Sequence, residues 1–174
     1  MAEPVDWALD QLPIHPHVAA ESEWQGLRVD GLVAAPFTLS RGDLTDAGRG
    51  KLTDDFHCTD GWVVPGLRWE GVPVTVLLDR AGPLPEAAYV AFSAGEYNVG
   101  LTVEQARSTN VIVALRLNEE ALTTEHGGPC RLVAQGQLCH FSVKWLDRIR
   151  LMAVPPEETG LKIVTARKAQ SSQS

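Results

Sequence analysis

The order of the apolar segments constrains the fold more than any other feature of this sequence. Most of these segments have the length of a strand, the helical ones are short, and the two kinds do not alternate regularly. A doubly wound parallel sheet needs regular alternation, because each parallel crossover usually contains a helix. The 174 residues suit a single domain. The chain is therefore predicted to be α+β, with mixed or antiparallel sheets and short helices.

Strands are predicted where apolar and polar residues alternate or where β-branched residues form short buried runs. The predicted strands are Trp24–Ala34 with a turn at Gly31, Lys51–Cys58, Ala88–Ser93, Val111–Leu117 followed by a turn at 118–120, Cys130–Ala134 and Ser142–Val154. The predicted helices are Phe37–Leu44, Pro73–Ala81 and a short one that opens at Thr102 and runs to about Arg107. Gly82 is expected to end the second helix, and Thr102 with Gln105 resembles a capping box that begins the third.

The two ends of the chain differ from its middle. Residues 1–23 contain three prolines and little periodicity, which predicts an extended arm with at most one turn of helix at Trp7–Leu12. Residues 24–156 are predicted to form the folded domain. Residues 157–174 become polar and predict a tail, disordered over 169–174.

Charge and cysteine content exclude several classes of function. A net charge of −7 argues against a nucleic-acid-binding protein that works through a basic face. Three cysteines, none in a C-x-x-C motif, do not make a disulfide framework. The first ten residues have no apolar core of a signal peptide, and no apolar run reaches transmembrane length, so a cytoplasmic protein is expected unless a leader has been removed.

Cys58 is the first candidate functional residue. It lies in Phe56-His57-Cys58-Thr59-Asp60-Gly61-Trp62, at the end of a predicted strand and outside any apolar run. Thiolate is the ligand that soft or high-valent metals prefer. The alternative is a small buried thiol, which remains the simplest interpretation of Cys130 and Cys139.

Two later segments contain separated cations. In His126-Gly127-Gly128-Pro129-Cys130-Arg131, the glycines allow close approach of a ligand and their N–H groups can face an anion, while Arg131 can bind phosphate. In Ser142-Val143-Lys144-Trp145, Ser142 and Lys144 would share one face of a strand. Each segment alone is better explained as a solvated hairpin loop or strand face. Together with Cys58 they predict a site for an anionic metal cofactor.

Two other chemistries are weaker. His57-Cys58 and Cys139-His140 are adjacent pairs, and neighbouring residues on a strand face opposite ways, so neither pair chelates zinc easily. A cysteine nucleophile with a distant His and Asp is possible, but no hydrolase signature accompanies it.

Taken together, these stretches resemble the oxidoreductase molybdopterin-binding domain of the sulfite oxidase family, including its small bacterial and archaeal members and the methionine-sulfoxide reductase catalytic subunit. The resemblance runs from about residue 24 to 151. Each motif is short, and the specificity lies in their order and spacing. The motifs are Leu27-Arg28-Val29-Asp30-Gly31, Cys58-x-x-Gly61-Trp62, Trp69-x-Gly71-Val72-Pro73, Tyr89-Val90-Ala91-Phe92-Ser93, His126-Gly127-x-Pro129-x-Arg131-Leu132 and Val143-Lys144-Trp145.

The resemblance implies the sulfite-oxidase type of molybdopterin-binding fold and a molybdenum centre, with tungsten as an alternative metal. The metal would be held by the dithiolene of one molybdopterin, by oxo or hydroxo groups and by the thiolate of Cys58. The residues that the resemblance places at the cofactor are Ser93, His126, Arg131, Ser142, Val143 and Lys144, with Tyr97 over the metal and, more loosely, His15 and His17 in the first segment.

The implied activity is a molybdopterin-dependent oxidoreductase, or its catalytic subunit, that transfers an oxygen atom or two electrons on a small substrate such as sulfite or a sulfoxide. A separate electron-transfer partner is expected. Sulfite oxidases present an arginine shortly after the ligand cysteine, whereas Trp62, Val63 and Val64 are apolar here. Arg68 and Arg116 would replace it only if the fold brought them in. The alternatives are a non-catalytic molybdopterin carrier or an interaction module.

Overall fold

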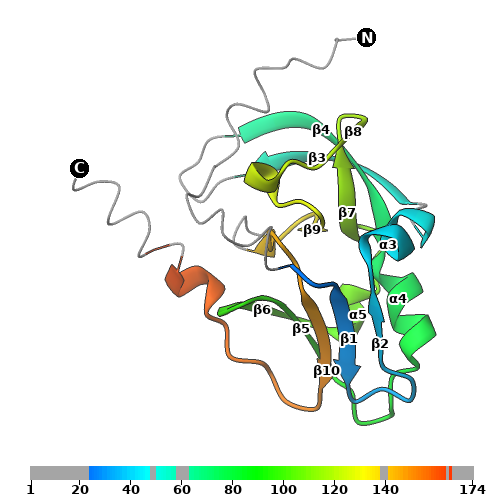
Figure 1. Ribbon diagram of the computed structural model, residues 1–174. Helices are drawn as coiled ribbons and strands as arrows, with labels where there is room; N and C mark the ends of the chain where they lie inside the picture. The colour runs from blue at the N-terminus through cyan, green and yellow to red at the C-terminus, as the bar shows by residue number, and fades with distance from the viewer. Residues whose placement is uncertain (1–23, 48–49, 58–62, 138–140, 164, 166–174) are drawn as a thin grey trace.

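The computed structural model describes residues 24–47, 50–57, 63–137, 141–163 and 165. These residues form two sheets, drawn one above the other in Figure 1, and the helices between and beside them are short. The elements are β1 Leu27–Gly31, β2 Phe37–Leu39, α3 Arg41–Ala47, β3 Gly50–His57, β4 Val63–Pro73, α4 Val74–Ala81, β5 Tyr89–Ala94, β6 Tyr97–Thr102, α5 Val103–Ala106, β7 Val111–Leu117, β8 Glu120–Ala121, η1 Thr124–His126, β9 Arg131–Ala134 and β10 Arg148–Met152.

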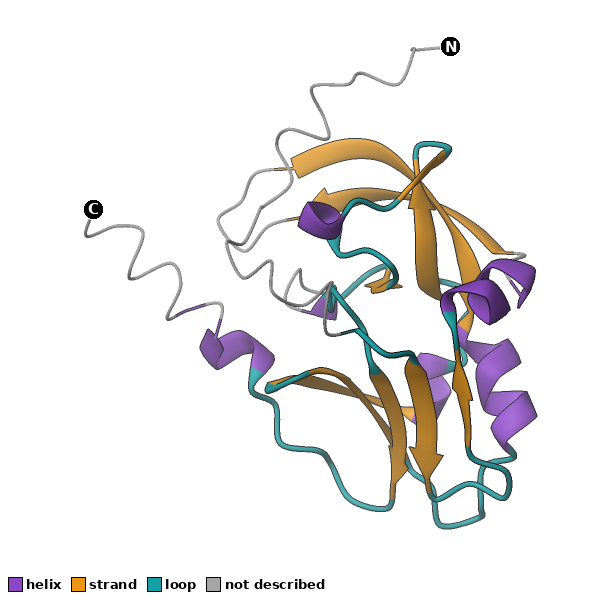
Figure 2. Ribbon diagram, in the orientation of Figure 1, coloured by secondary structure: helices purple, strands orange, loops and turns teal. Residues whose placement is uncertain are grey.

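The first sheet is mixed and the second is antiparallel. The first has the strand order β2-β1-β10-β5-β6, in which only the β1–β10 pair is parallel. The second has the order β3-β4-β7-β8, and β9 pairs with β7 as well. Figure 2 shows how little of the chain is helical. The predicted α+β class with mixed or antiparallel sheets is confirmed.

Most of the core lies between the two sheets. Apolar residues from β1, β5, β6 and β10 pack there against α4, β7 and β9, as the buried residues Leu27, Phe92 and Leu132 illustrate. A smaller cluster lies on the other face of the second sheet. Its buried members are Leu52, Leu67, Trp69, Ile112, Ala114, Leu117 and Val133. The second sheet is thus covered by apolar side chains on both faces, which explains the continuous apolar run of β7.

Local signals placed several elements correctly. The helix predicted over 73–81 is α4, and Gly82 ends it with a φ of 67° and an N–H bond to the carbonyl of Leu78. The capping box is present: the Thr102 hydroxyl accepts from the N–H of Gln105, whose side chain accepts from the N–H of Thr102. The strands predicted over 51–58, 88–93, 111–117 and 130–134 correspond to β3, β5, β7 and β9.

Other predictions were wrong or incomplete. Residues 37–39 are a strand paired with β1, and the helix begins only at Arg41, because Ser40 and Asp43 exchange capping hydrogen bonds. The second strand predicted after Gly31 is therefore displaced to β2. The predicted strand 142–154 is β10 only from Arg148 onward. The strands β4 and β6 were not predicted.

Within the described residues, no helix is both long enough and apolar enough to cross a membrane. The expected arm 1–23 and disordered end 169–174 lie outside the described residues.

Candidate functional site

The two predicted cofactor-binding segments lie side by side in the fold. One is the loop 123–131, which contains η1 and leads into β9, and the other is the segment 141–147, which leads into β10. Three backbone hydrogen bonds join them: Leu132 N to Val143 O at 2.9 Å, Trp145 N to Gly127 O at 3.1 Å and Leu146 N to Cys130 O at 3.0 Å. Two segments that are separate in the sequence are thus held together in the fold. A single site that includes both segments needs them to be adjacent in this way.

Side chains of the second segment fix η1. The Lys144 ammonium donates to the carbonyl of Glu125 at 2.9 Å, and the Trp145 indole donates to the carbonyl of Thr124 at 2.8 Å. These carbonyls belong to a single helical turn, whose acceptors need partners outside the turn. The orientation of the loop 123–131 therefore depends on Lys144 and Trp145.

Ser142 and Lys144 do not lie on a strand, contrary to prediction. The segment 142–147 has no strand hydrogen-bonding pattern, and Trp145 has a φ of 56°. Alternation of side chains therefore does not apply to it. Val143 is buried and belongs to the main core, while Ser142 and Lys144 are half-buried.

The glycines of the loop serve close packing. Gly127 has a φ of 101°, and a Cβ there would lie within 3.1 Å of three Lys144 atoms. A Cβ on Gly128 would lie 2.4 Å from the Leu122 carbonyl oxygen. The N–H groups of both glycines donate within the turn, to Thr124 and Thr123. The expectation that these N–H groups face an anion is wrong, because they are already used.

Arg131 is the exceptional side chain of the site. Its residue is 2% exposed, and among the described residues no other polar or charged residue is as deeply buried. One guanidinium nitrogen donates to the carbonyl of His126 at 2.9 Å, and the guanidinium lies 4.9 Å from the centre of the Trp69 ring. Its Nε atom is buried without a hydrogen-bond partner, and none of the ion pairs between described residues includes Arg131.

Burial lowers the pKa of Arg131 to about 10, and the Coulombic influence of Tyr97 opposes that decrease. Arg131 therefore stays cationic at neutral pH. A buried cation with an unused donor is costly unless an acceptor or an anion satisfies it. Such a group suits the phosphate or polar ring edge of an anionic cofactor.

Ser93 and Tyr97 lie next to this surface, at the turn between β5 and β6. The carbonyl of Ser93 accepts from the N–H of Asp147 at 3.0 Å, which places Ser93 at the end of the segment 141–147. The Ser93 hydroxyl donates to the side-chain oxygen of Asn98 at 2.7 Å. Tyr97 packs against the main core.

Three residues with a structural role at this surface were missed as site candidates from the sequence. Trp69 provides the aromatic face under Arg131, and Asn98 binds Ser93. Burial raises the pKa of the half-buried Asp147 carboxyl, although that carboxylate also accepts from the N–H of Gly95 at 3.1 Å. Trp69 is part of one of the motifs in the sequence. For none of the three residues does the neighbouring sequence show which side chains lie next to it in the fold.

Cys58 follows β3 directly, as predicted, but it lies outside the described residues, as do Cys139, His15 and His17. The ends of β3 and β4 that flank it are paired, His57 with Val63. Cys130 is fully buried, and its thiol donates to the Leu146 carbonyl at 3.3 Å. Burial raises the pKa of Cys130 far above the ordinary thiol value, so this thiol belongs to the core, as its simpler interpretation held.

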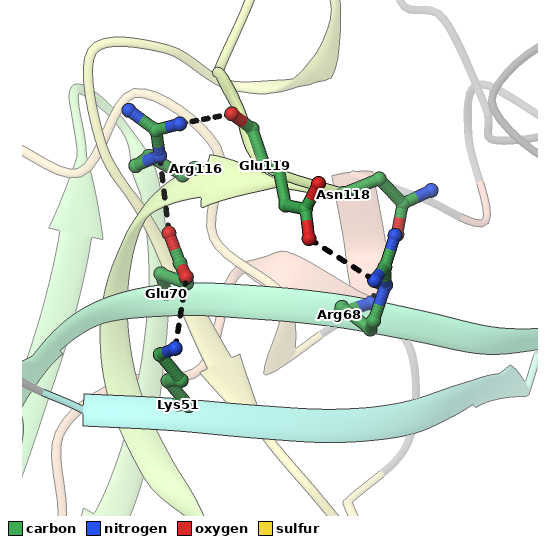
Figure 3. Close-up of polar contacts among 6 residues, drawn as sticks. All are labelled: Lys51, Arg68, Glu70, Arg116, Asn118 and Glu119. Carbon is green, nitrogen blue, oxygen red and sulfur yellow. Dashed lines mark hydrogen bonds and ion pairs between the residues drawn. The ribbon is translucent and has the colours of Figure 1, made fainter. Parts of the chain in front are cut away.

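Arg68 and Arg116 are not brought to Arg131. They belong to a partly exposed charged patch on the side of β4 and β7 opposite Trp69, called the outer face, where Arg116 pairs with Glu70 at 3.0 Å and Arg68 with Glu119 at 3.3 Å (Figure 3). Trp69 lies between Arg68 and Glu70 in β4, so its ring points to the opposite face, where Arg131 is. Neither arginine therefore substitutes for the cation that follows the cysteine in sulfite oxidases.

No group of three or more His, Cys, Asp or Glu side chains suitable for a metal gathers within the described ranges. A bound metal there would need ligands from a cofactor or from outside those ranges. Arg131, Lys144 and Ser93 suit the polar and anionic part of a molybdopterin by their chemistry, because they offer a buried cation with an unused donor, an ammonium and a hydroxyl.

Comparison with known proteins identifies relatives of this chain. The uncharacterized oxidoreductase YuiH of Bacillus subtilis (strain 168) is 33% identical over 136 residues, which cover 78% of this chain and 68% of YuiH. The methionine-sulfoxide reductase catalytic subunit MsrP of Gluconobacter oxydans (strain 621H) is 29% identical over 76% of this chain and 48% of MsrP. The NADPH nitrate reductase of Beauveria bassiana is 31% identical over 74% of this chain.

The crystal structure of the sulfane dehydrogenase SoxCD from Paracoccus pantotrophus superposes with a TM-score of 0.69 at 27% identity, over 77% of this chain and 39% of that one. The chain spans about two thirds of YuiH, about half of MsrP and 17% of the nitrate reductase. The predicted molybdopterin-binding fold is confirmed by this likeness. The family model described as the oxidoreductase molybdopterin binding domain matches residues 12–159. The chain belongs to the oxidoreductase molybdopterin-binding domain family, whose cofactor is molybdopterin carrying molybdenum.

Proposed function

We propose that the chain is a molybdopterin-dependent oxidoreductase, or the catalytic subunit of one, with Cys58 as the protein ligand to the metal. The observation that carries the proposal is Arg131: a buried cation with an unused Nε donor, next to the segment that contains Lys144. Desolvation of this cation is costly, and an anion bound at its unused donor would offset that cost.

Each residue has a separate proposed role. Arg131 and Lys144, with the loop at His126, bind the phosphate and polar edge of the pterin. Ser93 contributes a hydroxyl, and Ser142 contributes polar contacts. Val143 is buried and supports the second segment from the core. Tyr97 lies over the substrate side. When bound, the cofactor supplies two-electron and oxygen-atom transfer, and the protein orients it and the substrate.

The substrate is proposed to carry less charge than sulfite. Sulfite binding needs a cation close to the metal, and the two candidate arginines, Arg68 and Arg116, are paired with carboxylates on the other face of β4. A sulfoxide needs no such cation. The relative MsrP is named as a methionine-sulfoxide reductase, which agrees with this class. The electron donor or acceptor is proposed to be a separate protein.

The test begins with the metal. Protein made in a host that synthesises molybdopterin is analysed for molybdenum and tungsten and assayed with dye-linked donors and acceptors on sulfoxides and sulfite. One metal atom per chain and turnover of a sulfoxide are expected. Cys58→Ser should keep the fold but change the metal's spectrum and abolish turnover.

Cys130→Ala is the matched control, because that thiol is buried in the core and away from solvent. It should retain the metal and the activity per metal. A Cys58→Ser protein with an unchanged spectrum and activity would show that the ligand is misassigned. A protein that binds the cofactor without turnover on any substrate would instead be a carrier.

A further inference from the structure

The chain after β10 returns and lies along β6, the edge strand of the first sheet (Figure 1). The contact begins at Pro156: a Cβ on Gly100 would lie 2.4 Å from the Pro156 ring. A short helix begins at Gly160. This C-terminal segment, residues 156–163, was expected to be a polar tail from Glu157 onward, so its ordered contacts with β6 have to be explained.

Thr159 binds the peptide groups on both sides of Tyr97. Its hydroxyl accepts from the N–H of Asn98 at 2.9 Å and donates to the carbonyl of Glu96 at 2.5 Å. Its own N–H donates to the carbonyl of Asn98 at 3.0 Å. One side chain thus fixes the backbone immediately before and immediately after Tyr97.

Gly160 lies against the Tyr97 ring itself. A Cβ at Gly160 would lie 3.0 Å from two ring carbons of Tyr97 and 2.8 Å from a methyl carbon of Val99. Since real Cβ contacts are longer than this, any larger residue at position 160 would move the ring or the segment. The position of the ring therefore depends on the segment as well as on the core.

The same segment reaches Ser93 through Asn98. The Asn98 amide donates to the carbonyl of Glu157 at 2.6 Å, and its oxygen accepts from the Ser93 hydroxyl at 2.7 Å. An asparagine side chain held in this way has a fixed orientation, because its donor and its acceptor have different partners. Ser93 and Tyr97, two of the proposed site residues, are thus both connected to the C-terminal segment.

Protection of an edge strand is the simpler explanation, since exposed edges are commonly covered. A segment that only covered the edge would be expected to make similar hydrogen bonds along the whole strand. The hydrogen bonds to residues 96–98 are instead 2.5 to 3.0 Å long, whereas the one farther along, from Gly100 N to the Glu158 carboxylate, is 3.4 Å long.

We propose that residues 157–160 are a positioning element of the active site, in which Thr159 and Gly160 fix the position of Tyr97 at the bound cofactor. This inference rests on the proposed function, because it gives Tyr97 a task at the site. Thr159 and Gly160 are positioning residues and touch neither substrate nor cofactor.

The first test uses cofactor-free protein. The chain contains only two tyrosines, Tyr89 and Tyr97, so protein labelled with 3-fluorotyrosine gives two fluorine NMR resonances, assigned with Tyr97→Phe. Thr159→Val should shift or broaden the resonance of Tyr97 and leave that of Tyr89 unchanged. Thr159→Ser should restore the wild-type spectrum, because it keeps the hydroxyl. Thr165→Val, which removes a hydroxyl that donates to the carbonyl of Leu161, is the matched control.

The second test uses metal-loaded protein. Thr159→Val should lower kcat per molybdenum by about tenfold or more while metal content and Tm stay near wild type, and Thr159→Ser should recover the activity. An unchanged Tyr97 resonance in Thr159→Val, or an unchanged kcat per metal, would overturn the proposal. If loaded wild-type protein shows no turnover, the proposed function fails, and the fluorine spectra still decide whether the segment positions Tyr97.

Discussion

The two faces of the second sheet contain arginines in opposite situations. On the outer face Arg68 and Arg116 have side chains 41% and 50% exposed, and each pairs with a carboxylate. On the opposite face Arg131 is 2% exposed and pairs with no carboxylate among the described residues. Exposed, paired charges contribute little to stability and need no ligand. A buried cation with an unused donor needs an acceptor or an anion to offset its desolvation. Burial combined with incomplete pairing therefore distinguishes the site from a solvated charge network.

The largest effect is expected for Arg131→Met. Loss of the charge-assisted contacts should weaken cofactor binding by about 10- to 100-fold. The free energy of unfolding of cofactor-free protein should stay level or rise, because a buried, incompletely paired cation has been removed. Molybdenum content and denaturant titration measure the two effects.

Arg116→Met is the matched control on the outer face. It should leave the molybdenum content unchanged and alter the free energy of unfolding by less than about 1 kcal/mol. Equal metal loss in the two arginine variants would contradict the distinction between the two faces.

An intermediate effect is expected for Asp147→Asn and concerns pH. Burial raises the pKa of Asp147 above its ordinary value of 3.8, so the folded state binds this proton more tightly than the unfolded state does. The stability that Asp147 contributes is complete below pH 3.8 and is lost as the pH rises through the raised pKa. The free energy of unfolding of the wild type minus that of Asp147→Asn should therefore fall with rising pH. Denaturant titrations from pH 3 to 7 measure this difference, and a flat or rising difference would refute the assignment.

The smallest effect is expected for Glu70→Gln on the outer face. Glu70 pairs with Lys51 at 3.6 Å and with Arg116 at 3.0 Å, and all three side chains are partly exposed. Loss of both pairs should lower the free energy of unfolding by at most about 1 kcal/mol, and the loss should shrink in about 1 M salt. Titrations at low and high salt check this. A larger loss that persists in salt would mean that the outer face is more than a surface network.

The sequence predicts the fold well where the signal is local. The proline and glycine that bound α4, the capping box at Thr102 and the apolar run of β7 each depend on neighbouring residues only. The strands β4 and β6 were missed because their residues are mixed in polarity and owe their conformation to pairing with distant strands. The segment 142–147 looks like a strand but is held by bonds to the loop 123–131, which no local pattern shows.

The candidate site divides in the same way. Arg131 and Lys144 could be selected from the sequence because cations beside glycines suit an anion, and the fold brings their two segments together. Trp69 and Asn98 could not be selected in this way. Trp69 contacts Arg131, which is distant in the sequence, and Asn98 contacts Ser93 only because the chain turns between β5 and β6. The anion-facing role predicted for the N–H groups at Gly127 and Gly128 failed because turn formation uses them first.

The position of β10 has a consequence for synthesis of the protein. Among the strands of the first sheet, the one made last occupies the middle, between β1 and β5. Until it emerges from the ribosome, the sheet can exist only as two unconnected hairpins, and a chain cut before Arg148 loses its centre. Because β10 directly follows the segment with Lys144 and Trp145, completion of the sheet also delivers the second half of the site. A chain that has not yet formed β10 therefore lacks both the centre of this sheet and the support that places the segment 141–147.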